Sequence, residues 1–234
     1  MYAEKNFLVI DGIDGSGKDT QGELLQHYFE TIGKIVFMTR EPSDSIFGKM
    51  FRSNLSTREY NNVIDAYLVS ADRVLHSEEI LKHLNKDEIV ICNRYKISTY
   101  AYQTLTYGNK SQKMSLTDLM TFNQFAIDPE ICIFLDIDPE LAIKRVAKRN
   151  GKPEKFDKLK TLEELRSNFW WAMDYESNDD TNMTKFIIIN VAEEDTPEVI
   201  HNRIIKRLVN FNTDRKGAKL EPEIPDELKD DDED

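Results

Sequence analysis

A glycine-rich loop between a strand-like run and a helix-like stretch is the feature that most constrains this chain. The run from Phe7 to Asp11 is followed by glycines at positions 12, 15 and 17, and Lys18 opens a helical pattern. Glycine lets the backbone curl so that consecutive N–H groups point inward, and the following helix adds its positive N-terminal end. The pattern therefore predicts a phosphate-binding loop, with a nucleoside polyphosphate as its ligand.

Strand-like and helix-like segments alternate along the chain. The strand-like runs are Phe7–Asp11, Lys34–Met38, Ile89–Asn93, Ile131–Asp136 and Lys185–Asn190. Helical patterns cover Lys18–Thr31, Ile46–Asn54, Tyr60–Leu84, Ser98–Tyr107, Leu116–Ala126, Pro139–Arg149, Thr161–Tyr175 and Pro197–Phe211. Because strands that are apolar nearly throughout must be covered on both faces, the alternation predicts an α/β fold of three layers, with a five-stranded parallel sheet between two layers of helices.

Length and composition favour a single globular domain. The chain has 234 residues, of which 40% are hydrophobic and 32% charged, enough to bury one core. No apolar run approaches the roughly 20 residues that cross a bilayer, and the first residues do not resemble a signal peptide. We therefore expect a cytoplasmic protein.

The C-terminal end differs from the rest of the chain in charge. Residues 221–234 hold nine acidic residues and one lysine, so they carry −8 of the net charge of −12. A segment with so little apolar surface is expected to be disordered. We predict one folded domain over residues 1–213 and an acidic tail over residues 214–234. The remaining charge of −4 argues against a nucleic-acid groove.

Cysteine and histidine show no metal-binding pattern. Cys92 and Cys132 each lie in an apolar run, which predicts buried thiols rather than a disulfide or a metal site. The histidines at positions 27, 76, 83 and 201 are scattered, so packing or surface roles are expected.

Charged and polar residues follow four of the predicted strands. Asp14 and the glycine-rich loop follow the first strand, Thr39–Pro42 the second, Asn93–Tyr95 the third and Asp138–Glu140 the fourth. Ligands of parallel sheets bind beyond the carboxyl ends of the strands. These residues are therefore expected to surround one crevice.

Taken together, these segments resemble the thymidylate kinase family, P-loop enzymes that transfer the terminal phosphoryl group of ATP to dTMP. The similarity runs from about Phe7 to Phe211. It is carried by the glycine-rich loop with Asp14, Thr39–Pro42 with Gly48 and Arg52, Ser70–Arg73, Asn93–Tyr95 with Ser98, Thr99 and Ala101–Gln103, and Leu135–Glu140 with Arg145 and Arg149. The order and spacing of all five segments are much more specific than the loop alone, which indicates only a superfamily.

The resemblance implies ATP and dTMP as substrates, Mg²⁺ as cofactor and a homodimer. The ATP phosphates would be held by Gly12, Ile13, Asp14, Gly15, Ser16, Gly17, Lys18, Asp19 and Thr20. Asp14 would bind the sugar 3′-hydroxyl of the acceptor, Arg94 its phosphate and Arg73 its base. Ser98 and Gln103 would line the same pocket, with Arg40 and Arg52 near the acceptor.

A mobile lid is implied by the same resemblance. Some members of the family carry a transition-state arginine in the P-loop directly after the aspartate, but here that position is Gly15. The lid, about residues 149–157, must then supply the charge. Arg149 is the first candidate, before Lys152 and Lys155, and joins Lys18, Arg94 and Asp14 as a predicted catalytic residue. No general base is needed, because a phosphate monoester with a second pKa near ~6 is largely a dianion at neutral pH.

Three residues depart from the family pattern. Asp19 stands where a Ser or Thr usually offers a hydroxyl to Mg²⁺, and Asn93 where an Asp usually stands. We expect these two changes to compensate each other and both residues to lie at the metal. Val69 occupies the position of an aromatic residue that stacks on thymine, so Tyr67, Phe51 or Tyr102 could stack instead.

The same residues argue against two other classes of P-loop protein and leave two further functions open. A deoxynucleoside kinase needs a carboxylate base near the end of the third strand, which Asn93 cannot supply. A GTPase needs an Asn-Lys-x-Asp element, and residues 109–112 fail on residue type and position. Another nucleoside monophosphate kinase, or a nucleotide-binding protein weakened in catalysis by Asp19 and Asn93, stays open.

Overall fold

The computed structural model describes residues 3–57, 61–105, 114–150, 156–179 and 182–213. Within these ranges, five parallel strands form one sheet in the order β2-β3-β1-β4-β5. The strands are β1 (Ala3–Asp11), β2 (Val36–Arg40), β3 (Ile89–Asn93), β4 (Asp128–Ile137) and β5 (Lys185–Val191). The helices of the described residues are α1 (Lys18–Thr31), α2 (Ile46–Thr57), α3 (Asn62–Leu84), α4 (Lys96–Gln103), α5 (Leu116–Phe122), α6 (Pro139–Asn150), α7 (Phe156–Asn178) and α8 (Pro197–Thr213).

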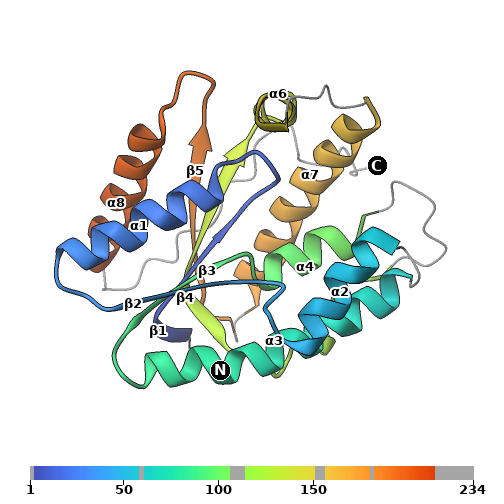
Figure 1. Cartoon of the computed structure of the whole chain (residues 1–234), viewed down its shortest axis with the longest axis horizontal. Helices are drawn as coiled ribbons and strands as arrows, with labels where there is room; N and C mark the ends of the chain where they lie inside the picture. The colour runs from blue at the N-terminus through green and yellow to red at the C-terminus, as the bar shows by residue number, and fades with distance from the viewer. Residues whose placement is uncertain (1–2, 58–60, 106–113, 151–155, 180–181, 214–234) are drawn as a thin grey trace.

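Helices cover both faces of the sheet, as Figure 1 shows. α1 and α8 pack together on one face, whereas α3, α4 and α7 lie on the other. α2 packs against α3, and α6 against α7. The predicted three-layer α/β fold with a five-stranded parallel sheet is therefore confirmed.

The central strands are apolar because both of their faces are buried. Phe7 and Ile10 of β1, Ile91 of β3 and Ile133 of β4 have no exposed surface. Cys92 and Cys132 are free, buried thiols in the same core, as predicted. At about 25 cal/mol per Å² of apolar surface removed from water, this layer contributes a large share of the folding free energy.

The strand order brings the candidate residues to one edge. β1 lies between β3 and β4, so the glycine-rich loop leaves the middle of the carboxyl edge. Ile10 is in register with Asn93, and Asn93 with Arg40. The segments that follow β1, β2 and β3 therefore begin side by side, where parallel sheets bind their ligands.

Several predicted boundaries were wrong, because tertiary contacts set the ends of the helices. α4 begins at Lys96 rather than Ser98, since the Asp11 carboxylate of β1 accepts hydrogen bonds from the backbone N–H groups of Tyr95 and Ser98. α5 ends at Phe122 rather than Ala126, where Asn123 caps it. α7 also starts five residues before its predicted beginning.

None of the helices in the described ranges combines the length and the apolar character that crossing a membrane requires.

Candidate active site

The glycine-rich loop connects β1 to α1 and presents the first turn of α1 to a ligand. Gly17 is the N-cap residue of α1 and has a left-handed backbone (φ 96°). Because glycine has no side chain, Gly17 makes no side-chain capping hydrogen bond to the first turn. The first N–H groups of a helix have no partners within the helix, and they carry its positive dipole end. An uncapped helix start of this kind suits a phosphate group.

Lys18 is held inside the loop. Its side chain is 7% exposed, and its Nζ donates to the carbonyl oxygen of Ile13 at 3.1 Å and lies 3.5 Å from Oδ1 of Asp14. Burial and the charge of Arg94 lower the pKa of Lys18 to about 8, against the opposing effect of Asp14. An anionic ligand would therefore stabilise the charged form of Lys18, which is buried beside a second cation.

This pKa predicts that nucleotide binding weakens as pH rises through 8. Below that pH Lys18 is charged and attracts the polyphosphate, whereas above it the free protein holds a neutral amine. Binding should also take up a proton near pH 8. We expect the affinity for ADP to fall several-fold between pH 7 and 9 in calorimetry, with proton uptake seen as a dependence on buffer ionisation enthalpy. The same uptake in Lys18→Arg would refute the assignment to Lys18.

Arg94 and Asp14 face each other at the mouth of the loop. Nη2 of Arg94 donates to Oδ1 of Asp14, and its Nη1 donates to the hydroxyl of Tyr102 at 3.1 Å. The guanidinium group also lies 5.2 Å from the centre of the Tyr102 ring. Partial removal from water would raise the pKa of Asp14, but the charges of Arg94 and Lys18 outweigh this effect and lower it. Asp14 therefore stays ionised and holds two cations near the phosphate loop.

The backbone of Arg94 has an uncommon conformation. Its φ is 68°, in the left-handed region that residues other than glycine rarely adopt. Its N–H donates to the carbonyl oxygen of Ile10 at 2.9 Å, which fixes the turn after β3 on β1. Such conformations collect at functional sites, where the surrounding structure enforces them.

Asp11 is a site residue that the sequence analysis missed. Its fully buried carboxylate accepts hydrogen bonds from the N–H of Gly12 (2.9 Å) and the hydroxyl of Ser98 (2.7 Å). It thereby ties the glycine-rich loop to the start of α4. Burial raises the pKa of Asp11, against the charge of Arg94. A carboxylate at the end of an otherwise apolar strand was the available signal.

Ser98 and Gln103, predicted in the acceptor pocket, are both buried in α4. The Ser98 hydroxyl donates a hydrogen bond to Asp11, and its Oγ lies 3.5 Å from Nη1 of Arg94. Gln103 is 7% exposed at the end of the helix. Ser98 therefore lies next to Arg94, the residue predicted to bind the acceptor phosphate. A contact of Ser98 or Gln103 with the acceptor stays a prediction.

Arg73 is the centre of a buried polar network. Its Nε and Nη2 donate to Oε2 of Glu41 at 2.8 and 2.6 Å, Nη2 also to Thr99 at 2.8 Å, and Nη1 to Asn123 at 2.5 Å. The other oxygen of Glu41 lies 3.1 Å from Nδ1 of His76. Four of the five guanidinium N–H groups are thus bonded within the protein. If Arg73 reaches the base as predicted, one Nη1 hydrogen is left for that contact.

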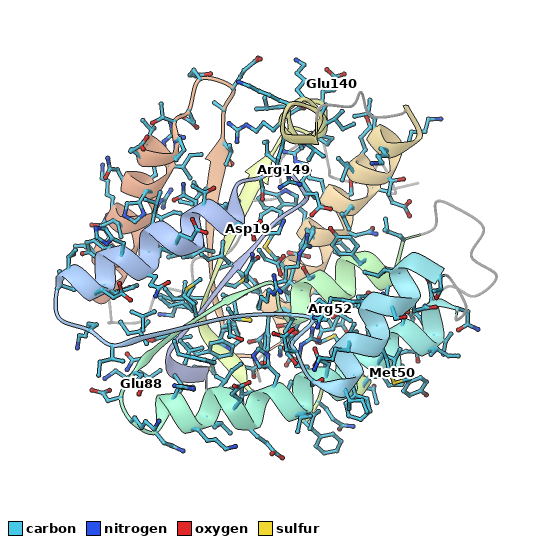
Figure 2. All side chains as sticks on the ribbon, viewed as in Figure 1. Asp19, Met50, Arg52, Glu88, Glu140 and Arg149 are labelled. Atoms are coloured by element: carbon cyan, nitrogen blue, oxygen red, sulfur yellow. The ribbon has the colours of Figure 1, made fainter. Side chains whose placement is uncertain are left out.

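The two remaining arginines of the predicted acceptor site differ. Arg40 is exposed at the carboxyl end of β2. Arg52 donates to the carbonyl oxygens of Pro42 (2.6 Å) and Ser43 (2.7 Å) and pairs with Asp44. Figure 2 shows Arg52 turned from α2 toward the centre of the molecule, whereas Met50 points outward. Arg52 therefore stabilises the loop after β2, whereas the Arg40 side chain is exposed at the carboxyl edge of the sheet.

Comparison with known proteins identifies the family. A family model described as "Thymidylate kinase" matches residues 10–204. The chain belongs to the thymidylate kinase family. A probable thymidylate kinase of Thermococcus kodakarensis is 34% identical over 210 residues, covering 85% of this chain and 95% of the relative. One of Methanocaldococcus jannaschii is 36% identical over 206 residues, covering 88% and 96%.

A solved structure agrees with this assignment. The crystal structure of thymidylate kinase from Ehrlichia chaffeensis is similar with a TM-score of 0.61 and 27% identity. The match covers 87% of this chain and 97% of that one. The family and its fold are thus supported over nearly the full length of the relatives.

Gly15 shows why the P-loop of this family member carries no arginine after Asp14. Its φ is 90°, and a Cβ atom there would lie 2.5 Å from the carbonyl oxygen of Ala142 in α6. No side chain fits between the loop and α6. Arg149 lies seven residues after Ala142 and therefore on the same side of α6, two turns further on. Lys152 and Lys155 lie outside the described residues.

Asp19 and Asn93, the two departures near the metal, are in contact. Nδ2 of Asn93 donates to Oδ1 of Asp19, while Oδ1 of Asn93 is buried and has no hydrogen-bond partner among the described residues. Carboxylate and amide oxygens are the ligands that Mg²⁺ prefers. The two residues therefore fit a magnesium ion, and Asp19 and Asn93 would hold it next to the nucleotide phosphates.

The residues considered for stacking on the base lie in different places. Val69 belongs to a small apolar cluster with Phe47, Phe51 and Leu68. Tyr67 stacks on Phe122 and is 55% exposed, and Tyr102 is engaged by Arg94. Phe51 is thus the candidate that shares a cluster with Val69.

Proposed function

We propose that this chain transfers the terminal phosphoryl group of ATP to dTMP, giving ADP and dTDP. The family assignment supports the reaction, and one observation in the site carries it. Arg94, Asp14 and Lys18 meet at the mouth of the phosphate loop, between the ends of β1 and β3. Two cations next to an uncapped helix start would attract the phosphate groups of two nucleotides and offset the repulsion between them.

The residues divide the work between the two nucleotides. The loop from Gly12 to Thr20 would bind the phosphates of ATP with its N–H groups and with Lys18. Arg94 would leave Asp14 and bind the acceptor phosphate. Asp14 would then accept a hydrogen bond from the 3′-hydroxyl group of the acceptor. Tyr102 and Ser98 hold Arg94 in place for this exchange.

The reaction itself needs alignment and charge neutralisation. An oxygen of the dTMP phosphate forms a bond to the γ-phosphorus of ATP, and the bond from that phosphorus to the oxygen bridging to the β-phosphate breaks. The acceptor attacks as a dianion, so no side chain has to remove a proton. Mg²⁺, when bound, would neutralise part of the charge on the phosphates. Arg149, near the end of α6 and in the predicted lid, would add positive charge near the transferred phosphoryl group.

A substrate panel tests the proposal. ADP release would be recorded for Mg²⁺·ATP with dTMP, dUMP, other nucleoside monophosphates and thymidine. We expect turnover with dTMP well above that with thymidine. Turnover with thymidine alone would indicate a nucleoside kinase, and tight ATP binding with no turnover would indicate a weakened nucleotide-binding protein.

We also propose that the chain forms a homodimer through α3. Four partly exposed apolar residues, Ile64, Tyr67, Val74 and Leu75, follow helical spacing on one face of this helix. An apolar stripe on a helix surface is typical of an interface with another chain.

The dimer makes a direct prediction. Tyr67→Glu with Leu75→Glu should convert a species of twice the chain mass into a monomer in light scattering, because two buried charges oppose association. Lys206→Glu, an exposed position on α8 at the opposite face of the sheet from α3, is the matched control and should leave the mass unchanged. A wild-type monomer at micromolar concentration would contradict the proposal.

The cytoplasmic location and the acidic tail stay predictions. The tail, residues 214–234, lies outside the described residues.

A further inference from the structure

Asp19 and Asn93 meet across the site although they are far apart in the chain. Asp19 lies in the first turn of α1, directly after Lys18, and Asn93 is the last residue of β3. P-loop enzymes usually place a hydroxyl at the first of these positions and an acidic residue near the second, and both help to hold Mg²⁺. This chain has the acid on the loop and the neutral oxygen on the strand.

The contact fixes the orientation of the Asn93 amide. An ionised carboxylate only accepts hydrogen bonds, so Asp19 must face the NH₂ group of the amide. Oδ1 of Asn93 is then turned away from Asp19, and it is the oxygen that lies buried without a partner in the described part of the chain. Buried polar atoms normally have a hydrogen-bond partner, so this oxygen is available to bind a ligand.

We infer that Asp19 and Asn93 form a cation site in which the negative charge has moved from the strand to the phosphate loop. Asp19 supplies the charge and orients Asn93, and Asn93 supplies a neutral oxygen. The inference rests on the proposed phosphoryl transfer site and deepens it. Mg²⁺ is commonly held by one or two protein oxygens together with substrate phosphates.

The first test uses the sign of the effect on ADP affinity. Without metal, the Asp19 carboxylate repels the nucleotide phosphates, so Asp19→Asn should bind ADP as tightly as the wild type or somewhat more tightly in EDTA. With Mg²⁺ present, the same variant should lose about tenfold in ADP affinity, because the charge that holds the cation is gone. A purely structural role of Asp19 would weaken binding equally under both conditions, and that result would overturn the inference.

A matched control lies one turn further along α1. Glu23 is exposed on the same helix, four residues after Asp19 and therefore about one turn further from the phosphate loop. Glu23→Gln removes the same charge. Its ADP affinity should change by less than about twofold with or without Mg²⁺, since exposed charges at this distance are screened. A tenfold metal-dependent loss in this control as well would show that the effect is only net charge.

The second test moves the charge back. Asp19→Thr should lower the affinity of the protein–ADP complex for Mn²⁺, measured by electron paramagnetic resonance, by about tenfold. Asp19→Thr combined with Asn93→Asp restores the usual arrangement and should bring the affinity back to within about threefold of the wild type. No loss in Asp19→Thr, or no recovery in a folded double variant, would overturn the inference.

Both tests remain decisive if one variant fails. Asp19 is exposed, so its substitution is expected to leave the fold intact, as circular dichroism would check. If the double variant does not fold, the opposite effects of Asp19→Asn in EDTA and in Mg²⁺ decide alone. Neither experiment contains dTMP. A failure of the dTMP kinase reaction and a failure of the relocated cation site are therefore distinguishable.

Discussion

Arg94→Ala should lower kcat/KM for dTMP by about 10³-fold or more, while ATP binding changes far less. The guanidinium group stands between Asp14 and Tyr102, at the place where the acceptor phosphate is proposed to bind. The guanidinium group stays charged: burial alone would lower the pKa of Arg94, but the interactions with Tyr102 and Asp14 outweigh this effect and raise it. Removing a cation that acts on the transferred phosphoryl group or its acceptor commonly costs this much. Steady-state kinetics with both substrates varied would measure it.

Arg94→Lys is the informative companion variant. Lysine keeps the charge but loses the planar pair of donors that fits a phosphate, so an intermediate loss in kcat/KM is expected. A rise in KM for ATP with an unchanged KM for dTMP would instead place Arg94 in the donor site. Full activity of Arg94→Ala would contradict the assignment altogether.

Arg73→Ala should be the most destabilising single change near the site, by about 3–5 kcal/mol in the free energy of unfolding. The side chains of Arg73 and Glu41 are 2% and 5% exposed, so solvent does not screen the pair. Without the arginine, Glu41 would be a buried carboxylate whose remaining neighbour is His76 at 3.1 Å. Asn123 and Thr99 would lose their donor as well. Urea denaturation followed by circular dichroism would measure the loss.

A double-mutant cycle separates the pair from the cavity. Arg73→Ala with Glu41→Ala should cost clearly less than the sum of the single changes, because no unpaired charge is left. Additive effects, or a loss below about 1 kcal/mol for Arg73→Ala, would show that Glu41 and Arg73 do not depend on each other.

The fold was predictable because burial on both faces leaves a clear mark on the strands. Ile89–Asn93 was predicted with both ends correct, since four of its five residues are buried. The helix starting at Lys96 was placed two residues late, because its cap comes from Asp11, which is far away in sequence. Local pattern carries no information about such a partner.

The site was predictable where a motif fixes the backbone and less so where side chains choose partners. The glycine-rich loop and Lys18 lie as expected around an uncapped helix start. Asp11 was missed, and Glu41 was noted only as part of Thr39–Pro42 without a role, because each works by holding other residues. Arg52 was expected at the acceptor, but its donors bind the carbonyl oxygens of Pro42 and Ser43. Which acceptor an arginine reaches depends on the folded structure.

A crystal structure with ADP and dTMP bound together would show whether two nucleotides face each other across Arg94 and the phosphate loop. We expect the ADP phosphates against the loop from Gly12 to Thr20, with the dTMP phosphate within about 3 Å of the Arg94 guanidinium group. Asp14 should then contact the sugar 3′-hydroxyl instead of Arg94. An empty acceptor pocket under saturating dTMP, or Arg94 still turned to Asp14 and away from the phosphate, would contradict the account.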